Sequence, residues 1–240
     1  MVDTVTREDD DDLAARRRSA RRVALVAGFI GLVAVLVWMF VFSPVLGAKH
    51  VVVHGAQTVP VSRIESVADV PHGRPLLRLD TAAIAGRVET LPDIAAASVH
   101  VSYPSTVVIT VTERVAVGYL SVGDSPPSAI LIDKSGRQFR TTPTVPKTLP
   151  RFDIPAGAQA TAAGQAVATV AGALTPAELG QLSSIAATDP TEITLRLRDG
   201  RNVVWGSADR SADKAQVLPA LLTRPGTTFD VSNPDVVVAR

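Results

Sequence analysis

The chain has 240 residues, a formal net charge of +1 and no cysteine; 46% of its residues are hydrophobic and 4% are aromatic. This balance does not indicate a nucleic-acid-binding protein, because phosphate contacts need a basic excess and single-strand binding needs aromatic platforms. The lack of cysteine excludes disulfide bonds and thiolate metal sites, and the length allows one or two small domains.

The first strong signal is an apolar segment, VALVAGFIGLVAVLVWMFVF at residues 23–42, which has 20 residues and no charge. As a helix it spans about 30 Å, the thickness of the hydrocarbon core of a bilayer. A buried helix of a soluble domain would need a polar face. The apolar region of a cleaved signal peptide is normally shorter, about 7–15 residues. We therefore predict an uncleaved, single-pass transmembrane helix.

The charges around this segment predict its orientation. Several arginines precede it, whereas only Lys49 follows soon after it. By the positive-inside rule, the tail at residues 1–22 is cytoplasmic and the chain beyond the span and its linker at residues 43–48 is extracytoplasmic. The acidic block at residues 8–12 is typical of a disordered, solvated tail. The arginines that set this topology are Arg16, Arg17, Arg18, Arg21 and Arg22.

A strand and two helices are predicted after the linker. Residues 49–55 (KHVVVHG) predict a strand that ends at a turn on Gly55. The next helix has two start signals, Pro60 in a first turn and a capping box of Ser62 and Glu65, which place its start slightly differently. A second helix is expected to begin after the N-cap Asp80 and to end before Pro92. The apolar stripes of the two helices are Val61, Ile64, Val67 and Ala68, and Ile84, Val88 and Leu91.

Residues 99–120 (VHVSYPSTVVITVTERVAVGYL) alternate between apolar and polar side chains on both sides of a Pro-Ser turn, which predicts an antiparallel hairpin. The order from residue 49 to 114 is then strand, helix, helix, strand, strand. Two amphipathic helices can cover one face of a three-stranded sheet and leave the other face open. The residues expected on the apolar face are Ala97, Val99, Val101 and Tyr103 in one strand and Val107, Ile109 and Val111 in the next.

The second half of the chain is predicted to be a mainly antiparallel β domain with helical insertions, so that the fold class is α+β. Strands are predicted at residues 116–120, 129–133, 193–206 as a hairpin with an Asp-Gly turn, and twice within 227–240. Helices are predicted at residues 161–174, 175–188 and 214–223. Thr175, Pro176 and Glu178 give the second of these helices a capping box and a proline at its first position.

Catalytic and metal-binding motifs are weak. Ser211-x-x-Lys214 matches the S-x-x-K pattern of penicillin-binding transpeptidases, and Lys134-Ser135-Gly136 resembles their lysine box. The lysine box precedes the serine box, however, and no S-x-N element lies between them, so we interpret both as chance matches. His50 and His54 lie about 13 Å apart on one face of a strand without a neighbouring carboxylate. We expect no enzyme, no metal and no cofactor.

Several segments together resemble the FtsQ and DivIB family of bacterial cell-division proteins, which have a polypeptide-transport-associated (POTRA) domain. They include the β-α-α-β-β order, Gly73 before LLRLD, ILIDKSG at residues 130–136, LRDGRNVVWG at residues 197–206 and the closing FDVSNPDVVVAR. The resemblance implies a POTRA domain at residues 49–115 and a β domain at residues 116–240. Tyr103 stands where the family often has tryptophan, and Ala116 where it has proline. The POTRA residues assigned to recruitment are Val51, Val53, Gly55, Tyr103, Pro104, Glu113 and Arg114.

The last residues are predicted to form a sheet edge that a partner can use. Three consecutive valines favour an extended backbone, Pro234 precedes them, and the given sequence ends shortly after them. The residues alone leave open an internal strand paired on both sides. The resemblance favours the edge, because in FtsQ-like proteins the last strand is where the coiled-coil proteins FtsB and FtsL dock by strand addition. The partner-binding residues predicted are Phe229, Val231, Asp235, Val236, Val237, Val238, Ala239 and Arg240.

The resemblance implies a non-enzymatic division scaffold in the cell membrane at the septum. It would link the cytoplasmic division ring to septal wall synthesis by binding FtsB- and FtsL-like proteins. The alternative is a membrane-anchored extracytoplasmic sensor that binds a ligand through its β domain. A pocket with convergent polar groups would favour the sensor.

Overall fold

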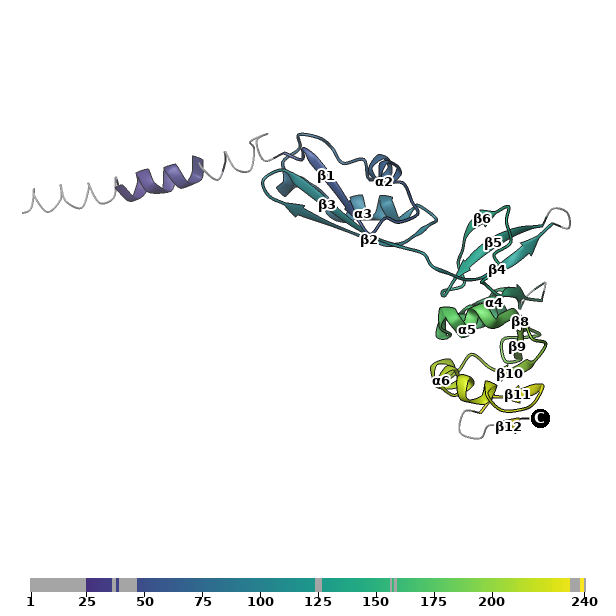
Figure 1. Cartoon of the computed structure of the whole chain (residues 1–240). Coiled ribbons are helices and arrows are strands. Elements are labelled where there is room, and N and C mark those ends of the chain that lie inside the picture. Colours follow the sequence, from purple (N-terminus) through teal and green to yellow (C-terminus); the bar gives the residue numbers. More distant parts are fainter. Residues whose placement is uncertain are drawn as a thin grey trace, which may run out of the picture. The chain divides into compact units, whose positions relative to one another are not determined.

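A computed structural model of the chain describes residues 25–35, 38, 47–123, 127–155, 157, 159–233 and 238–239 (Figure 1). The chain divides into two compact units. The first unit comprises the described residues up to Glu89 together with residues 96–111. The second comprises residues 90–95 together with the described residues from Thr112 onward.

The first unit contains a three-stranded sheet with two helices. Its elements are β1 (His50–His54), α2 (Val61–Ala68), the 3-10 helix η2 (Leu76–Arg78), α3 (Thr81–Glu89), β2 (Ile94–Ser102) and β3 (Thr106–Glu113). The predicted order of strand, helix, helix, strand, strand is confirmed. The sheet order is β1-β3-β2, and β1 runs parallel to β3 with Val51 opposite Val107 and Val53 opposite Ile109. Parallel neighbours need a long connection, and here it consists of the two helices followed by β2.

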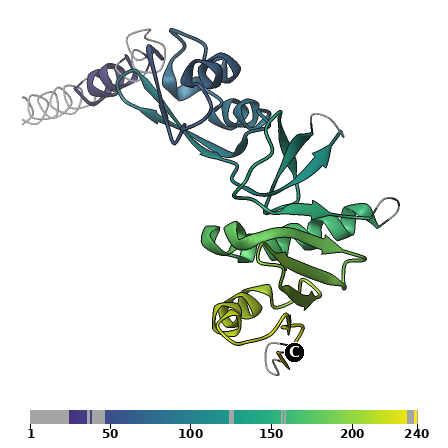
Figure 2. The ribbon, with the colours of Figure 1, turned by 45° about the vertical axis from the view of Figure 1, so that its right-hand side comes forward.

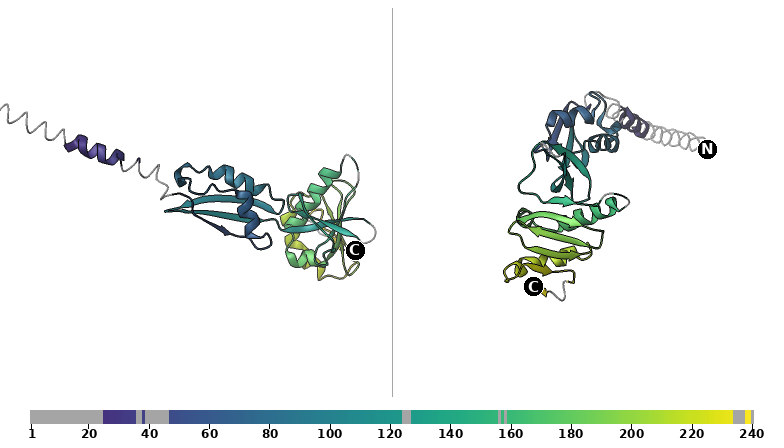
Figure 3. Two further views of the ribbon diagram at one scale, coloured as in Figure 1. Left: turned by 90° about the horizontal axis from the view of Figure 1, so that it is seen from above. Right: turned by 90° about the vertical axis from the view of Figure 1, so that its right-hand side faces the viewer.

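One face of this sheet and one side of each helix form the core. Figure 3 shows α2 and α3 on the same side of the sheet. The inward positions predicted in β3 are confirmed, and Val99 of β2 is also buried. Tyr103 was expected to share that face, but its side chain is 53% exposed, because β2 ends at Ser102 and Tyr103 lies in the turn. The main buried side chains are Ile64, Ala68, Ile84, Val88, Val107, Ile109 and Val111.

The helix starts are only partly those predicted. Asp80 is the N-cap of α3, because the amide of Ala83 donates to its Oδ1 at 2.9 Å. The capping box at Ser62 and Glu65 is wrong. Helix α2 begins at Val61 after Pro60, and no side chain caps it. Ser62 is therefore already inside the helix, where its hydroxyl cannot occupy the N-cap position.

The second unit is built on a nine-stranded mixed sheet in the order β12-β11-β10-β9-β8-β7-β4-β5-β6, which Figures 1 and 2 show from β6 to β12. Its strands are β4 (Ala116–Val122), β5 (Ser128–Asp133), β6 (Gln138–Thr142), β7 (Arg151–Asp153), β8 (Leu182–Ala187), β9 (Ile193–Leu197), β10 (Asn202–Gly206), β11 (Thr228–Asp230) and β12 (Val238–Ala239). Its helices are α4 (Ala160–Ala173), α5 (Pro176–Gln181) and α6 (Ser211–Leu222).

The helices lie where the sheet needs crossovers. The pairs β7–β8 and β10–β11 are parallel, and α4 with α5 connects the first pair while α6 connects the second. The pair β4–β7 is also parallel, and the other pairs are antiparallel. Helix α4 packs against β4, β5, β8 and α6. The core of this unit includes Trp205, Phe229, Ile185, Ile193, Leu195 and Leu218.

The helix predicted at residues 175–188 is wrong in its second half. The capping box of Thr175 and Glu178 and the N1 proline are present, but α5 ends at Gln181 and β8 follows directly. Leu179, Leu182 and Ile185 recur at a helical spacing, so the sequence alone favours a longer helix. The chain becomes a strand because Ile185 pairs with both Phe152 of β7 and Leu195 of β9.

The predicted transmembrane segment lies only partly within the described residues, of which 25–35 and 38 are helical. Within the part of the chain that the structure describes, no helix reaches the length and apolarity needed to cross a membrane. The arginines predicted to set the topology, at positions 16–22, lie outside the described residues.

Candidate partner-binding edge

The last strands of the nine-stranded sheet form its C-terminal edge. Strand β11 runs parallel to β10, with Val203 opposite Phe229 and Val204 opposite Asp230. Strand β12 then pairs antiparallel with β11, with Ala239 opposite Phe229. Among the described residues, β12 has β11 as its one strand neighbour, so the sheet ends there (Figure 1). An edge of this kind presents backbone N–H and C=O groups to a partner strand.

The predicted partner-binding residues fall into three groups in the structure. Phe229 and Val231 are fully buried, and the guanidinium of Arg201 lies 5.7 Å above the Phe229 ring. These two side chains belong to the hydrophobic core of the unit. Val238 and Ala239 form β12 at the edge. The other predicted positions, Asp235, Val236, Val237 and Arg240, lie outside the described residues.

Short hydrogen bonds hold β11 at both ends. The amide of Asn202 donates to the carbonyl oxygen of Thr227 at 2.9 Å, and the amide of Val231 donates to Val204 at 3.0 Å. At the exit of the strand, the Asp230 carboxylate accepts from the Ser232 amide at 2.9 Å and from the Ser232 hydroxyl at 2.6 Å. Because β11 is fixed in this way, it is a stable template for the strand that follows.

A buried polar cluster that the sequence reading missed lies beneath β10. The indole N–H of Trp205 donates to Ser211 Oγ at 3.1 Å, and Ser211 Oγ donates to the carbonyl of Ala208 at 2.7 Å. The Lys214 ammonium donates to the carbonyls of Trp205 and Ser207. Ser211 and Lys214 thus have structural partners, in line with a chance match to the transpeptidase motif. The sequence did hold a signal for the burial of Lys214. Lys214, Leu218 and Leu221 follow a helical spacing, which places this lysine on the buried stripe of α6.

The POTRA residues assigned to recruitment do not form one surface. Tyr103 and Pro104 are exposed and joined by a cis peptide bond at the β2–β3 turn. Glu113 and Arg114 are at the opposite end of β3. Val51 and Val53 are half-buried in β1. Gly55 has a φ of 85°, and a Cβ there would collide with the carbonyl oxygen of Val111, so its role in the structure is to allow this close turn.

Arg114 takes part in a buried ion pair. Its guanidinium bonds the Asp133 carboxylate and donates to the Pro92 carbonyl at 3.0 Å. Asp133 also accepts from Ser135 and from the amide of Arg137. Burial by itself would raise the pKa of Asp133, but the hydrogen bonds from Ser135, Arg114 and Arg137 outweigh it and hold the pKa below its usual value. This carboxylate is therefore charged at neutral pH.

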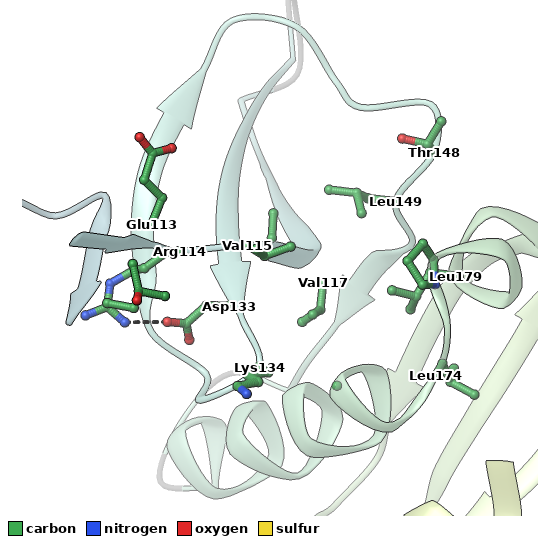
Figure 4. A pocket seen from close by; sticks show the side chains of 15 residues that line it. Glu113, Arg114, Val115, Val117, Asp133, Lys134, Thr148, Leu149, Leu174 and Leu179 are labelled. Atoms are coloured by element: carbon green, nitrogen blue, oxygen red, sulfur yellow. Dashed lines mark hydrogen bonds and ion pairs between the residues drawn. The ribbon is translucent and has the colours of Figure 1, made fainter. Parts of the chain in front are cut away.

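A cavity of about 440 Å³ lies beside this ion pair (Figure 4). Its lining is mainly apolar and includes Val115, Val117, Leu149, Leu174 and Leu179. Of the charged side chains in its wall, Arg114 and Asp133 are bonded to each other, and Glu113 and Lys134 also line it. The charges of Arg114 and Asp133 are therefore used within the protein instead of facing the centre of the cavity.

The architecture defines the class of the chain: a small β-α-α-β-β module followed by a larger β domain in which β12 is the last strand of the described sheet. Among the described residues, no group of three or more His, Asp or Glu side chains is placed to hold a metal ion. Family models identify the same two parts: a POTRA domain of the FtsQ type at residues 46–114 and the C-terminal domain of the cell division proteins FtsQ and DivIB at residues 126–236.

The chain belongs to the FtsQ/DivIB family of bacterial cell division proteins, as its relatives show. It is 41% identical over 216 residues to the cell division protein FtsQ of Mycolicibacterium smegmatis, which covers 90% of this chain and 64% of that protein. It is 32% identical over 230 residues to FtsQ of Streptomyces venezuelae, with 91% and 83% covered. The chain thus spans less than two thirds of the length of its mycobacterial relatives.

The chain is also similar to a solved structure of the major extracytoplasmic domain of the bacterial cell division protein DivIB from Geobacillus stearothermophilus. It is 22% identical, covers 45% of this chain and 91% of the solved chain, and has a TM-score of 0.35. The family assignment therefore rests on the sequence relatives and the two matched domains.

Proposed function

We propose that this chain is a non-enzymatic scaffold of the division machinery, anchored in the cell membrane at the septum with its N-terminus in the cytoplasm. Its β domain binds FtsB- and FtsL-like single-pass proteins, and its POTRA domain helps to recruit it to the division site. In this way it links the cytoplasmic division ring to septal wall synthesis. Membership of the FtsQ/DivIB family supports the divisional role.

The observation that carries the binding proposal is the position of β12 at the end of the sheet. Its pairing with β11 leaves the outer side of β12 without a strand neighbour among the described residues. A partner segment in extended conformation can add there through backbone hydrogen bonds. The three valines before Ala239 favour extended backbone, so affinity for the partner rests on strand pairing more than on aromatic anchors.

The test is co-purification of partners with the tagged full chain from detergent-solubilised membranes. We expect small single-pass coiled-coil proteins to be recovered with the full chain and lost from a variant truncated after Asn233. Val237→Pro removes one strand donor and is expected to weaken recovery in the same direction. A chain whose residues 23–42 are replaced by another apolar helix is the matched control and should retain its partners. Equal recovery with the truncated variant, shown to be folded by circular dichroism, would contradict the edge as the docking site.

A ligand-binding sensor is the second candidate, and the cavity beside Asp133 is the observation in its favour. Its volume suits a small ligand. The ion pair in the cavity wall argues against a sensor, because the buried charges of Arg114 and Asp133 are satisfied by one another. Leu149→Trp would fill this cavity: the scaffold proposal expects unchanged partner recovery and division, and a sensor would lose its function.

A further inference from the structure

Lys214 differs from the other lysines of the described residues in its burial. Its side chain is 2% exposed, whereas Lys49, Lys134 and Lys147 are exposed. The Lys214 ammonium donates to the carbonyl oxygens of Trp205 at 3.0 Å and Ser207 at 2.8 Å. Both acceptors lie at the end of β10 or directly after it, so the buried ammonium ties helix α6 to the end of this strand.

The charge of Lys214 is held there against the loss of its hydration. Burial lowers the pKa of Lys214, with an opposing contribution from Asp209, a further lowering by Arg210, and an opposing contribution from Asp230. A lowered pKa means that the unfolded chain binds the proton more tightly, so the free energy of unfolding rises as the pH passes above the folded pKa. Buried charges that do not add net stability can instead fix one conformation among alternatives.

The conformation fixed here is that of β10, on which β11 is aligned. Gly206, the last residue of β10, has a φ of 74°, and a Cβ there would lie 3.0 Å from the Cβ of Ser232. The chain that leaves β11 therefore packs directly against the end of β10. The amide of Val231 also donates to Val204 at 3.0 Å. A shift of the β10 end would accordingly displace β11, and with it the strand that pairs on β11.

We propose that Lys214 is a positioning residue for the C-terminal edge: its buried ammonium fixes the end of β10, thereby aligns β11, and so sets the line along which β12 and an added partner strand pair. The effect on partners rests on the proposed function. The effect on β11 does not, so the two can be tested separately.

The first test is hydrogen exchange on the full chain in detergent. Lys214→Met keeps the length of the side chain but leaves the two carbonyls without their donor. We expect amide exchange at Phe229, Asp230 and Val231 to become at least about tenfold faster, while α4 and β8 keep their protection. Lys134→Met is the matched control: it makes the same substitution at an exposed position and is expected to change neither region.

A second variant keeps the test decisive if Lys214→Met does not fold. Lys214→Gln retains two N–H donors on a shorter stem and is expected to loosen β11 less than methionine does. Unchanged exchange at β11 in a folded variant would overturn the proposal, as would an equal loosening of β11, α4 and β8.

Partner recovery is then measured on the same variants. Reduced recovery of FtsB- and FtsL-like proteins with Lys214→Met, in parallel with faster exchange at β11, supports the full proposal. Faster exchange at β11 with undiminished recovery would support the alignment of β11 by Lys214, and would contradict the C-terminal edge as the binding site.

Discussion

The outer edges of the two sheets differ in the groups that pair with them. At the edge of β2, the amide of Ala97 donates to a side-chain carboxylate, Glu89 Oε1, at 2.9 Å. At the C-terminal edge, β12 pairs with β11 at two positions and ends the sheet. Natural sheets block edges that must not be extended. The contrast indicates that the edge of the small sheet is partly closed by its own helix α3, while the described part of the large sheet shows no strand beyond β12.

The opposite end of the large sheet follows the rule for protected edges. Strand β6 carries Arg140, whose guanidinium pairs with Asp93 at 2.7 Å. The neighbouring strand β5 ends at Asp133, which holds the buried ion pair with Arg114. The β6 end is therefore anchored by charges, whereas the β12 end is the one proposed to pair with a partner strand.

The largest expected loss of unfolding free energy comes from Asp133→Ala, which breaks the ion pair with Arg114. The substitution leaves Arg114 buried without its carboxylate, which costs about 3–5 kcal/mol of unfolding free energy. Chemical denaturation of the full chain, followed by the fluorescence of the buried Trp205, measures it. Arg210→Ala breaks the exposed pair with Asp213 and is the control, with a loss of at most about 1 kcal/mol. Equal losses for both variants would contradict the account of an anchored β6 end.

The ion pair of Asp133 and Arg114 also predicts that the free energy of unfolding depends on pH in the acid range. The pKa of Asp133 is lowered in the folded chain, so its stabilising contribution is complete above the unfolded value of about 4 and is lost as the pH falls through the folded pKa. The difference in unfolding free energy between the wild type and Asp133→Asn should therefore shrink below about pH 4. Denaturation curves at several pH values test this, and a constant difference down to pH 2 would argue against the ion pair as its source.

A smaller effect is expected from Asp80→Ala, which removes the N-cap of α3, the helix that carries Glu89. The loss of this cap costs about 1 kcal/mol. Asp80→Asn keeps an acceptor at the same position and should retain most of the stability. Hydrogen exchange at the first turn of α3 reports the change directly, and unaltered protection there in Asp80→Ala would disprove the role of the cap.

The smallest change in stability is expected for Glu89→Ala, which opens the edge of β2. One exposed hydrogen bond contributes about 0.5 kcal/mol, the low end of the range for hydrogen bonds, because water replaces it when it is lost. The more informative readout is self-association, which should increase because the Ala97 amide becomes available for pairing. Analytical ultracentrifugation in detergent compares the variant with Glu89→Gln, whose amide oxygen can still accept. An unchanged association state in Glu89→Ala would mean that this carboxylate does not guard the edge.

Much of the small sheet could be predicted because its signals are local. Asp80, the alternation through Val107, Ile109 and Val111, and the turn at Gly55 act within a few residues. The large sheet depends on contacts that are distant in sequence. Residues 182–187 have an apolar spacing that also suits a helix, and pairing with β7 and β9 makes them a strand. Sequence periodicity cannot distinguish these outcomes.

At the C-terminal edge, too, local signals were predictable and contacts distant in sequence were not. The final strands were predicted from the valines and from Asn233 and Pro234, and β12 is confirmed at Val238 and Ala239. The burial of Phe229 and Val231 was not foreseen, because alternation in a three-residue strand does not reveal that these side chains join the core with Trp205 and Leu218. Lys214 was missed as well, since a lysine in a helix is usually on its exposed side.

The central claim is that partners add to the outer side of β12, and site-specific photo-cross-linking in living cells tests it most directly. A photoreactive residue at Val238 or Ala239 is compared with one at Thr141 in β6 and one at Val101 in β2, all in the full chain. We predict cross-links to small single-pass coiled-coil division proteins from β12 and none from the other two edges. Cross-links to these proteins from β6 or β2, with none from β12, would contradict the claim.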